Sequence, residues 1–219
     1  MPASGTTVGF LHTAPGHVTT FDALARRSGA GAVVDVVVPH LLDRARAATP
    51  DDDLGPAVAD AVRGLVDRGA DVVVCTCSTL GPLAERVDRV GAGVPVLRVD
   101  RPMAREAVRR GSRIGVVAAL QSTLGPTGDL LEEEAARAGA SVTLVESCVA
   151  EAWSAFEAGD QDGYLAQVSA AARALAGEVD VVVLAQASMA GAITDLDDLP
   201  IPVLASPQAA VRAALAAAP

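Results

Sequence analysis

Two stretches of the chain place polar side chains directly after a short apolar run, and both begin with aspartate. The first is Asp71–Thr79 (DVVVCTCST) and the second is Asp180–Ser188 (DVVVLAQAS). The sixth residue after the aspartate is Cys77 in the first copy and Gln186 in the second. A thiol can attack a substrate or transfer a proton, whereas an amide can only donate and accept hydrogen bonds. The sequence therefore indicates Cys77 as nucleophile or proton donor and Gln186 as a group that orients the substrate.

Hydroxyl groups next to the thiol could bind a carboxylate. Ser78 and Thr79 follow Cys77 at a predicted strand-to-helix turn, where backbone N–H groups and the positive end of a helix attract anions. The same groups would lower the pKa of the Cys77 thiol and favour the thiolate. The alternative is that Cys77 is a small buried apolar residue, as free cysteines usually are. Cys75 lies inside the predicted strand, and we expect it in the core.

Three further places supply polar side chains for substrate binding. Ser122 and Thr123 lie in a predicted turn, where they could hold a carboxylate or simply begin a helix, since both residue types are favoured there. His12 ends the first apolar run and could be an acid, a carboxylate partner or a structural histidine. Ala187 and Ser188 complete the second polar cluster, and we expect Ser188 to hold a carboxylate oxygen.

The segments around these residues alternate between apolar and amphipathic, which is typical of parallel βαβ units. The predicted strands are 8–12, 32–38, 71–75, 94–99, 113–119, 141–146, 180–184 and 201–204. The predicted helices are 18–27, 54–68, 102–110, 128–138, 163–176 and 207–217. His17 and His40 are expected at the surface or in loops.

The pattern restarts halfway along the chain, where residues 113–119 (RIGVVAA) match residues 7–13 (TVGFLHT). The restart predicts an α/β fold with two similar lobes, parallel sheets flanked by helices, and a pseudo-twofold relation between them. Ligands of such sheets bind beyond the carboxyl ends of the strands. We therefore expect the active site in the cleft between the lobes.

Composition excludes several classes of protein. The formal net charge of −10 argues against nucleic acid or an anionic membrane as partner, and no apolar run approaches the roughly 20 residues of a spanning helix. All 17 basic residues are arginine, which excludes a Schiff-base pyridoxal phosphate site and a lysine-dependent phosphate loop. Asp51, Asp52 and Asp53 fit a helix cap rather than a metal site. We expect a cytoplasmic protein without a metal.

These residues resemble a known family. The CST of Cys77–Thr79, the LAQASMAGA of Leu184–Ala192 and the RIGVVAALQST at the restart are similar to the aspartate/glutamate/hydantoin racemase superfamily, over essentially the whole chain. The resemblance implies two lobes that close over a small-molecule carboxylate substrate, no cofactor, and a possible homodimer. It implies a first lobe of residues 1–99 plus 206–219 and a second lobe of residues 100–205. In that family a cysteine from each lobe faces the substrate carbon, one removing a proton while the other supplies one.

Two positions depart from the family pattern. The first family cysteine corresponds to Cys77, but the asparagine that usually follows it is Ser78. The second corresponds to Gln186, with Ala187 or Ser188 in place of a threonine. Because an amide cannot transfer protons, two-thiol racemisation is not expected. The superfamily also contains one-cysteine decarboxylases of substituted malonates, whose cysteine is in the second lobe, and maleate isomerases, whose first-lobe cysteine attacks a double bond.

The sequence thus predicts a cofactor-independent enzyme that acts on a small carboxylate of amino acid, hydantoin or dicarboxylate type through a single thiol. Proton transfer, isomerisation and decarboxylation are all compatible with one thiol. Racemisation is a second possibility if His12 or an ordered water replaces the missing thiol. A third possibility is a non-catalytic carboxylate-binding or sensing protein on the same fold.

Overall fold

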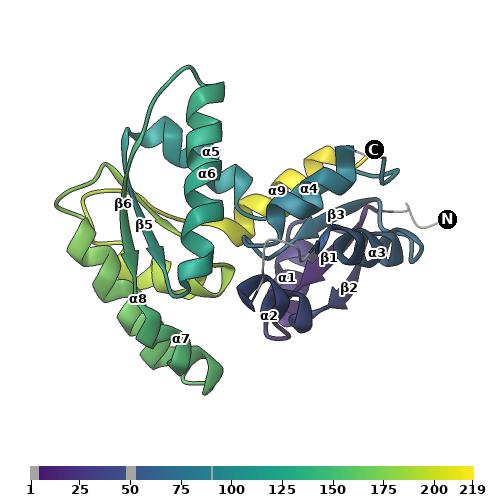
Figure 1. Cartoon of the computed structure of the whole chain (residues 1–219), viewed down its shortest axis with the longest axis horizontal. Coiled ribbons are helices and arrows are strands. Elements are labelled where there is room, and N and C mark those ends of the chain that lie inside the picture. The colour runs from purple at the N-terminus through teal and green to yellow at the C-terminus, as the bar shows by residue number, and fades with distance from the viewer. Residues whose placement is uncertain (1–4, 48–52, 90) are drawn as a thin grey trace. The chain divides into compact units, whose positions relative to one another are not determined.

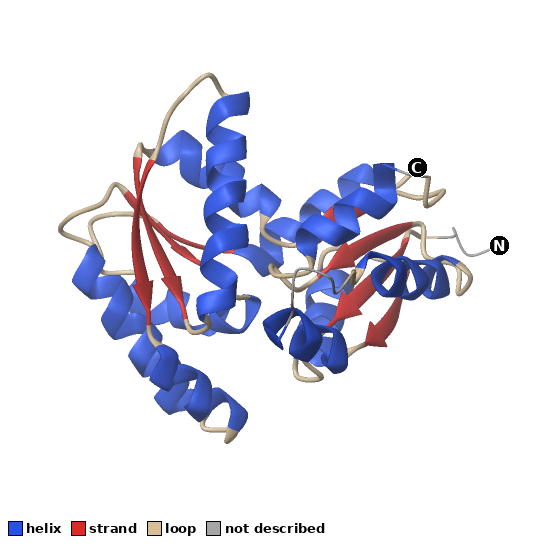
Figure 2. Ribbon diagram, in the orientation of Figure 1, coloured by secondary structure: helices blue, strands red, loops and turns tan. Residues whose placement is uncertain are grey.

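Strands and helices alternate along the chain in the computed structural model, which describes residues 5–47, 53–89 and 91–219 (Figures 1 and 2). The chain forms two compact units, the first made of Met1–Val99 with Pro207–Pro219 and the second of Asp100–Ser206. None of the described helices is long and apolar enough to cross a membrane.

The first unit contains a four-stranded parallel sheet with the strand order β2-β1-β3-β4. Its elements are β1 (Thr7–His12), α1 (His17–Arg27), β2 (Ala32–Val37), α2 (Pro39–Ala47), α3 (Gly55–Val66), β3 (Val72–Cys75), α4 (Gly81–Arg89) and β4 (Val96–Arg98), followed after the second unit by α9 (Ser206–Ala217).

The second unit repeats this arrangement in a parallel sheet with the order β6-β5-β7-β8. Its elements are α5 (Arg101–Arg110), β5 (Arg113–Ala118), α6 (Gln121–Arg137), β6 (Thr143–Cys148), α7 (Ala150–Glu157), α8 (Gln161–Leu175), β7 (Val181–Leu184), the 3-10 helix η1 (Ala187–Leu196) and β8 (Val203–Ala205). The predicted α/β fold with two similar parallel sheets flanked by helices is confirmed.

The repeated aspartate fixes the register of the two central strands in each unit. The Asp71 carboxylate accepts a hydrogen bond from the Thr7 N–H at 2.7 Å, and the Asp71 N–H donates to the Thr7 carbonyl at 2.8 Å. Asp180 makes the same pair of bonds with Arg113, both at 2.8 Å. Because a parallel pair with a fixed start can no longer slip, these contacts determine which residues meet at the far end of the strands.

The central strands β1 and β5 each carry a glycine where a neighbouring segment packs closely against the sheet. A Cβ added at Gly9 would lie 2.9 Å from the Cβ of Ala70, and one added at Gly115 would lie 3.2 Å from Leu175. Gly9 therefore has no room for a side chain, while at Gly115 the neighbouring leucine would have to shift.

Each face of the second sheet is covered by its own set of helices. Val117, Val182 and Leu184 pack with buried residues of α7, α8 and η1, whereas Ile114 and Val183 pack with buried residues of α5 and α6. Figure 1 shows α6 and α8 along opposite sides of β5. The valine-rich strands are thus buried on both faces, as expected for parallel sheets.

In the first unit the two faces of β1 have different surroundings. Leu11 belongs to an apolar core that includes Val73 and Cys75 of β3 and buried residues of α2, α3 and α4. On the opposite face, Phe10 and His12 contact Phe21 of α1, with ring centroids 5.2 and 5.7 Å away. Cys75 is fully buried, as expected from the sequence.

The sequence did not predict α2, α4, α7 or η1, and it placed the start of α6 too late. The missed segments are short, and proline opens α2 while Gly81-Pro82 opens α4, so both beginnings look like loops in the sequence although proline is favoured in a first helical turn. α6 begins at Gln121 and contains Pro126, where a turn was expected. Asp53 caps the Gly55 N–H at 2.8 Å, and Asp51 and Asp52 lie outside the described residues.

A buried ion-pair network joins α5 to α6. Glu134, only 4% exposed, accepts hydrogen bonds from Arg101 at 2.5 Å and Arg105 at 3.1 Å. Burial alone would raise the pKa of the Glu134 carboxyl, but the bonds from the two arginines outweigh it and lower that pKa. Glu134 is therefore charged in the folded protein.

Replacing Glu134 should destabilise the second unit. In Glu134→Gln the guanidinium of Arg101 loses one of its two carboxylate partners and keeps Glu133 at 3.0 Å, so we expect a loss of roughly 2 kcal/mol in the free energy of unfolding at neutral pH. The exposed Glu132→Gln is the matched control and should stay within about 0.5 kcal/mol. Because the folded-state pKa of Glu134 is lowered, the difference should persist above the ordinary glutamate pKa and disappear as the pH falls through the folded value. Urea unfolding at several pH values measures this, and equal loss in both variants would contradict it.

Candidate functional site

The sulfur of Cys77 lies just beyond the carboxyl end of β3, among hydrogen-bond donors. The hydroxyls of Thr13 and Thr79 and the backbone N–H groups of Thr79 and Leu80 bond to it. Cys77 is 8% exposed and also contacts the apolar core of the first unit, and Ser78 beside it is 6% exposed. The turn thus offers a polar nest to a sulfur that is otherwise buried.

The expectation that this turn lowers the pKa of the thiol is wrong. Burial is the largest effect and raises the pKa of the Cys77 thiol, while the hydrogen bonds from Thr13, Leu80 and Thr79 lower it by less. Removing a thiolate from water costs more than these neutral donors return. At neutral pH Cys77 therefore holds its proton and is an acid rather than a resting thiolate.

Gln186 occupies the matching position in the second unit and makes a matching contact. Its side-chain oxygen accepts a hydrogen bond from the Ala119 N–H at 2.6 Å. Ala119 stands where Thr13 stands in the first unit, six residues after the partner of the repeated aspartate. The amide oxygen is thus occupied, and the NH2 of Gln186 is the part of the side chain that can donate to a ligand.

His12 is fully buried and both of its ring nitrogens have protein partners. Nε2 lies 3.0 Å from Oδ1 of Asp35 and Nδ1 lies 2.9 Å from the hydroxyl of Thr76. Burial lowers the pKa of His12 and the hydrogen bond and charge of Asp35 raise it by less. The ring has no nitrogen left for a substrate in this arrangement, so His12 acts on the site through its neighbours.

His17 is not the surface or loop residue that the sequence suggested. It begins α1, its ring lies 6.2 Å from that of His12 and 5.9 Å from that of Phe21, and both ring nitrogens are buried with no hydrogen-bond partner among the described residues. Burial, and then the proximity of His12, lower the pKa of His17 to about 4. His40, in contrast, is exposed.

Ser122 and Thr123 lie in the first turn of α6, directly after β5. Thr123 is 2% exposed, and the hydroxyl of Ser122 is buried without a partner among the described residues. The first turn of the helix therefore places both residues at the carboxyl edge of the second sheet, with the Thr123 N–H donating to the Leu120 carbonyl at 3.0 Å.

Ala187 and Ser188 open η1 immediately after Gln186. Ala187 is 7% exposed and contributes to the apolar core. The Ser188 hydroxyl lies 2.7 Å from the hydroxyl of Tyr164, a fully buried residue of α8. Burial raises the pKa of Tyr164 to about 12, so this phenol stays protonated and fixes the serine.

Each unit thus gathers its own predicted residues at the carboxyl edge of its sheet. Cys77, Ser78, Thr79 and His12 come together in the first unit, and Ser122, Thr123, Gln186, Ala187 and Ser188 lie after β5 and β7 in the second. The sequence analysis gave no role to Asp35, Thr76 or Tyr164. It placed Thr13 beside His12 at the strand end without a role, although Thr13 stands six residues after Thr7 just as Cys77 stands six after Asp71.

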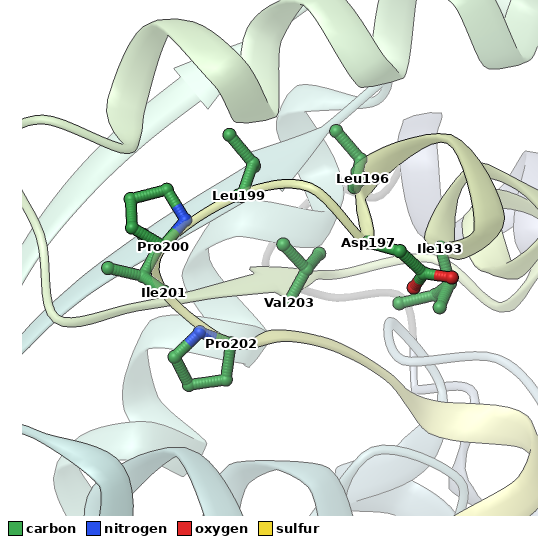
Figure 3. Close-up of a pocket in the computed structure, with 8 residues that line it drawn as sticks. All are labelled: Ile193, Leu196, Asp197, Leu199, Pro200, Ile201, Pro202 and Val203. Atoms are coloured by element: carbon green, nitrogen blue, oxygen red, sulfur yellow. The ribbon is translucent and has the colours of Figure 1, made fainter.

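The described residues offer no metal centre at these edges, and the pocket shown in Figure 3 lies elsewhere in the second unit. Within the described ranges, no three His, Cys, Asp or Glu side chains are grouped so that they could hold a metal ion. A pocket of about 340 Å³ lies in the second unit between η1 and β8 (Figure 3). Its lining is apolar apart from Asp197 and contains none of the predicted site residues.

Comparisons with known proteins agree with this fold. The family described as Asp/Glu/Hydantoin racemase matches residues 16–214. Aspartate racemase from Picrophilus torridus has a TM-score of 0.70 at 16% identity, covering 97% of this chain and 94% of that protein. Allantoin racemase from Klebsiella pneumoniae has a TM-score of 0.64 at 17% identity, covering 96% and 86%. An arylmalonate decarboxylase has a TM-score of 0.64 at 16% identity, covering 96% and 92%. A search of curated proteins gives no match.

Because the family match spans most of the chain, the protein belongs to the Asp/Glu/hydantoin racemase family, as the sequence resemblance predicted. The solved structures, all below 25% identity, show that the fold is shared.

The buried His17 should make the protein sensitive to mild acid. Its folded-state pKa of about 4 lies below the ordinary value, so stability is fully present above about pH 6.5 and falls as the pH drops toward 4. The lowered pKa of His17 corresponds to at most about 3 kcal/mol in the free energy of unfolding. In His17→Phe that part of the pH dependence should vanish, leaving the contribution of His12. Urea midpoints at pH 7 and 5 measure it, with the exposed His40→Phe as control. An unchanged pH dependence in His17→Phe would show that the ring is not buried as a neutral group.

Proposed function

We propose that the protein is a racemase-superfamily enzyme that acts on a small carboxylate through the single thiol of Cys77. The observation that carries the proposal is the setting of the sulfur, which is buried, protonated at neutral pH and bonded to two hydroxyls and two N–H groups. A structural cysteine would need none of these donors, since an apolar site satisfies a thiol.

The chemistry that suits this setting is proton donation to a carbanion or enediolate. A thiol that holds its proton at neutral pH can deliver it to a substrate carbon, and the donors from Thr13, Thr79 and Leu80 then stabilise the thiolate that forms. Each such donor contributes roughly 3 kcal/mol when it is aimed at a charge that develops in the transition state. In decarboxylation the carbon–carbon bond breaks, carbon dioxide leaves, and the thiol protonates the carbon.

The remaining polar residues are proposed to bind and orient the same substrate. Hydroxyls of Ser78 and Thr123 are suited to carboxylate oxygens, and Ser188 is suited to that role while Tyr164 holds it. The hydroxyl of Thr79, expected from the sequence to bind the carboxylate as well, already donates its one hydrogen to the sulfur. Gln186 would donate from its amide NH2, since its oxygen is taken by Ala119. The amide cannot accept a proton from carbon, so the proposed reaction is one-sided: protonation with one stereochemical outcome, isomerisation or decarboxylation.

Turnover should depend on Cys77 and on no other cysteine. We expect Cys77→Ala to abolish turnover of a carboxylate substrate and the exposed Cys148→Ala to leave it unchanged, because only Cys77 lies among donors that can stabilise a thiolate. A panel of amino acids, hydantoins, maleate and substituted malonates, assayed for optical rotation, isomerisation and carbon dioxide release, provides the measurement. Equal turnover in the two variants would remove the thiol from the mechanism. Carboxylate binding that survives Cys77→Ala, with no turnover by the parent protein, would instead support a binding or sensing role.

Supplying a second thiol should change the stereochemical outcome. In heavy water, the parent protein acting on one enantiomer should incorporate deuterium with retention, or release carbon dioxide, because it has one proton-transferring group. Gln186→Cys introduces a titratable group at the position of the second family cysteine, and we expect label uptake with inversion in this variant. Gln186→Ala is the control, because it also loses the bond to Ala119 without gaining a thiol. Inversion by the parent protein itself would contradict the one-sided mechanism and favour racemisation with another base.

A further inference from the structure

The carboxyl ends of β1 and β3 are joined by side chains twice, at consecutive positions. Nδ1 of His12 lies 2.9 Å from the Thr76 hydroxyl, and the next residue of each strand end, Thr13 and Cys77, bond to each other. Successive side chains in extended chain point to opposite faces of a sheet. The first contact therefore lies on the side of Phe21 and α1, and the second on the side of the apolar core.

The hydrogen atoms in the contact between His12 and Thr76 can be placed by counting donors and acceptors. An ionised Asp35 only accepts, so Nε2 of His12 carries the hydrogen that bonds to Asp35 at 3.0 Å. The ring is neutral at pH 7, since burial outweighs Asp35 and lowers its pKa, so Nδ1 accepts from the Thr76 hydroxyl. The hydroxyl has two acceptors within reach, Nδ1 at 2.9 Å and the Leu11 carbonyl at 3.2 Å, and we assign its hydrogen to the closer Nδ1, which has no hydrogen of its own in this tautomer.

We propose that Asp35, His12 and Thr76 form a positioning device that fixes the end of β3 so that Cys77 meets the hydroxyl of Thr13. The last backbone bond between β3 and β1 is the one from the Thr76 N–H to the Leu11 carbonyl at 2.9 Å, so the sheet ladder no longer holds Cys77 in place. The chain Asp35–His12–Thr76 adds side-chain contacts to this last backbone bond on one side of the strand end. The other groups facing the His12 ring are Phe10, Phe21 and the neutral His17.

The arrangement has features of a positioning chain rather than of a nucleophile. Thr76 is 2% exposed and His12 is fully buried, whereas the Asp35 side chain is 22% exposed. Asp35 is itself held, since Arg68 donates to its backbone oxygen at 2.7 Å. A substrate therefore reaches neither the hydroxyl nor the ring, and their effect on chemistry passes through Cys77.

The test measures the reactivity of Cys77 without a substrate, in a Cys148→Ser background that removes the exposed thiol. Iodoacetamide alkylation across pH 6–10, followed by intact mass, gives the apparent pKa of the thiol. Thr76→Val removes the hydroxyl without changing the shape, and we expect that pKa to rise by about one unit, as for loss of one hydrogen bond to the thiolate, with roughly tenfold slower alkylation below it. Thr76→Ser should restore the parent profile.

Two substitutions of His12 separate the two arms of the chain. His12→Asn keeps an amide near the place of Nδ1 and should preserve the profile, whereas His12→Gln keeps the contact with Asp35, loses Thr76 and should behave like Thr76→Val. A purely structural role predicts lower melting temperatures with unchanged alkylation profiles in all folded variants, and that result would overturn the proposal. If a His12 variant fails to fold, the imidazole nitrogen shifts of the parent protein decide, because a hydrogen on Nδ1 at pH 7 would also overturn it.

The inference rests on the proposed function, in that it takes Cys77 as the reacting thiol. The two can nevertheless fail separately. Turnover that survives Cys77→Ala would remove the proposed chemistry while leaving the alkylation result intact. An alkylation profile insensitive to Thr76→Val would remove the positioning device while leaving the dependence of turnover on Cys77 untouched.

Discussion

Everything at the two strand ends depends on the hydrogen bonds that Asp71 and Asp180 make at the beginning of β3 and β7. Each aspartate exchanges two bonds with the first residue of the neighbouring central strand, Thr7 or Arg113, at 2.7 to 2.8 Å. Parallel strands advance by the same distance per residue, so a register fixed at one end is carried to the other. Six residues later Cys77 stands beside Thr13, and Gln186 stands beside Ala119. The repeated aspartate thus helps to set, together with the ladder of the two central strands, which polar groups meet at the far end.

This constraint also explains which parts of the structure could be predicted. Apolar runs and the restart of the pattern were sufficient for the strands, since parallel sheets bury both faces and leave a continuous valine signal. Helices that open with proline or glycine, such as α2 and α4, were missed because the same residues mark loops. Cys77 and Gln186 were found by counting along the repeat. His17 and Asp35 were not, because burial and pairing between distant segments leave no periodic trace in the sequence.

Burial, rather than the donors, decides the charge of the thiol. A strand-to-helix turn with free N–H groups suggests a thiolate from the sequence, and the donors are present around Cys77. They are neutral, however, and the sulfur is only 8% exposed, so the cost of desolvating an anion is the larger effect. The same environment becomes favourable once a proton has left, because the hydroxyls and N–H groups are already oriented toward the new charge. Burial thus keeps the proton on Cys77, and in the proposed reaction the surrounding donors would stabilise the thiolate that remains.

Both units make an equivalent contact at the end of the strand, but with different chemical groups. The residue on the neighbouring central strand end determines which group donates the hydrogen bond. In the first unit Thr13 offers a hydroxyl that can donate to sulfur, while in the second unit Ala119 has no side-chain donor and uses its N–H toward the Gln186 oxygen. Both contacts place a donor against the side chain at the end of the strand. The register of the two central strands is equivalent in the two units, so the contrast between a thiol and an amide lies in the side chains at these positions rather than in the strands that carry them.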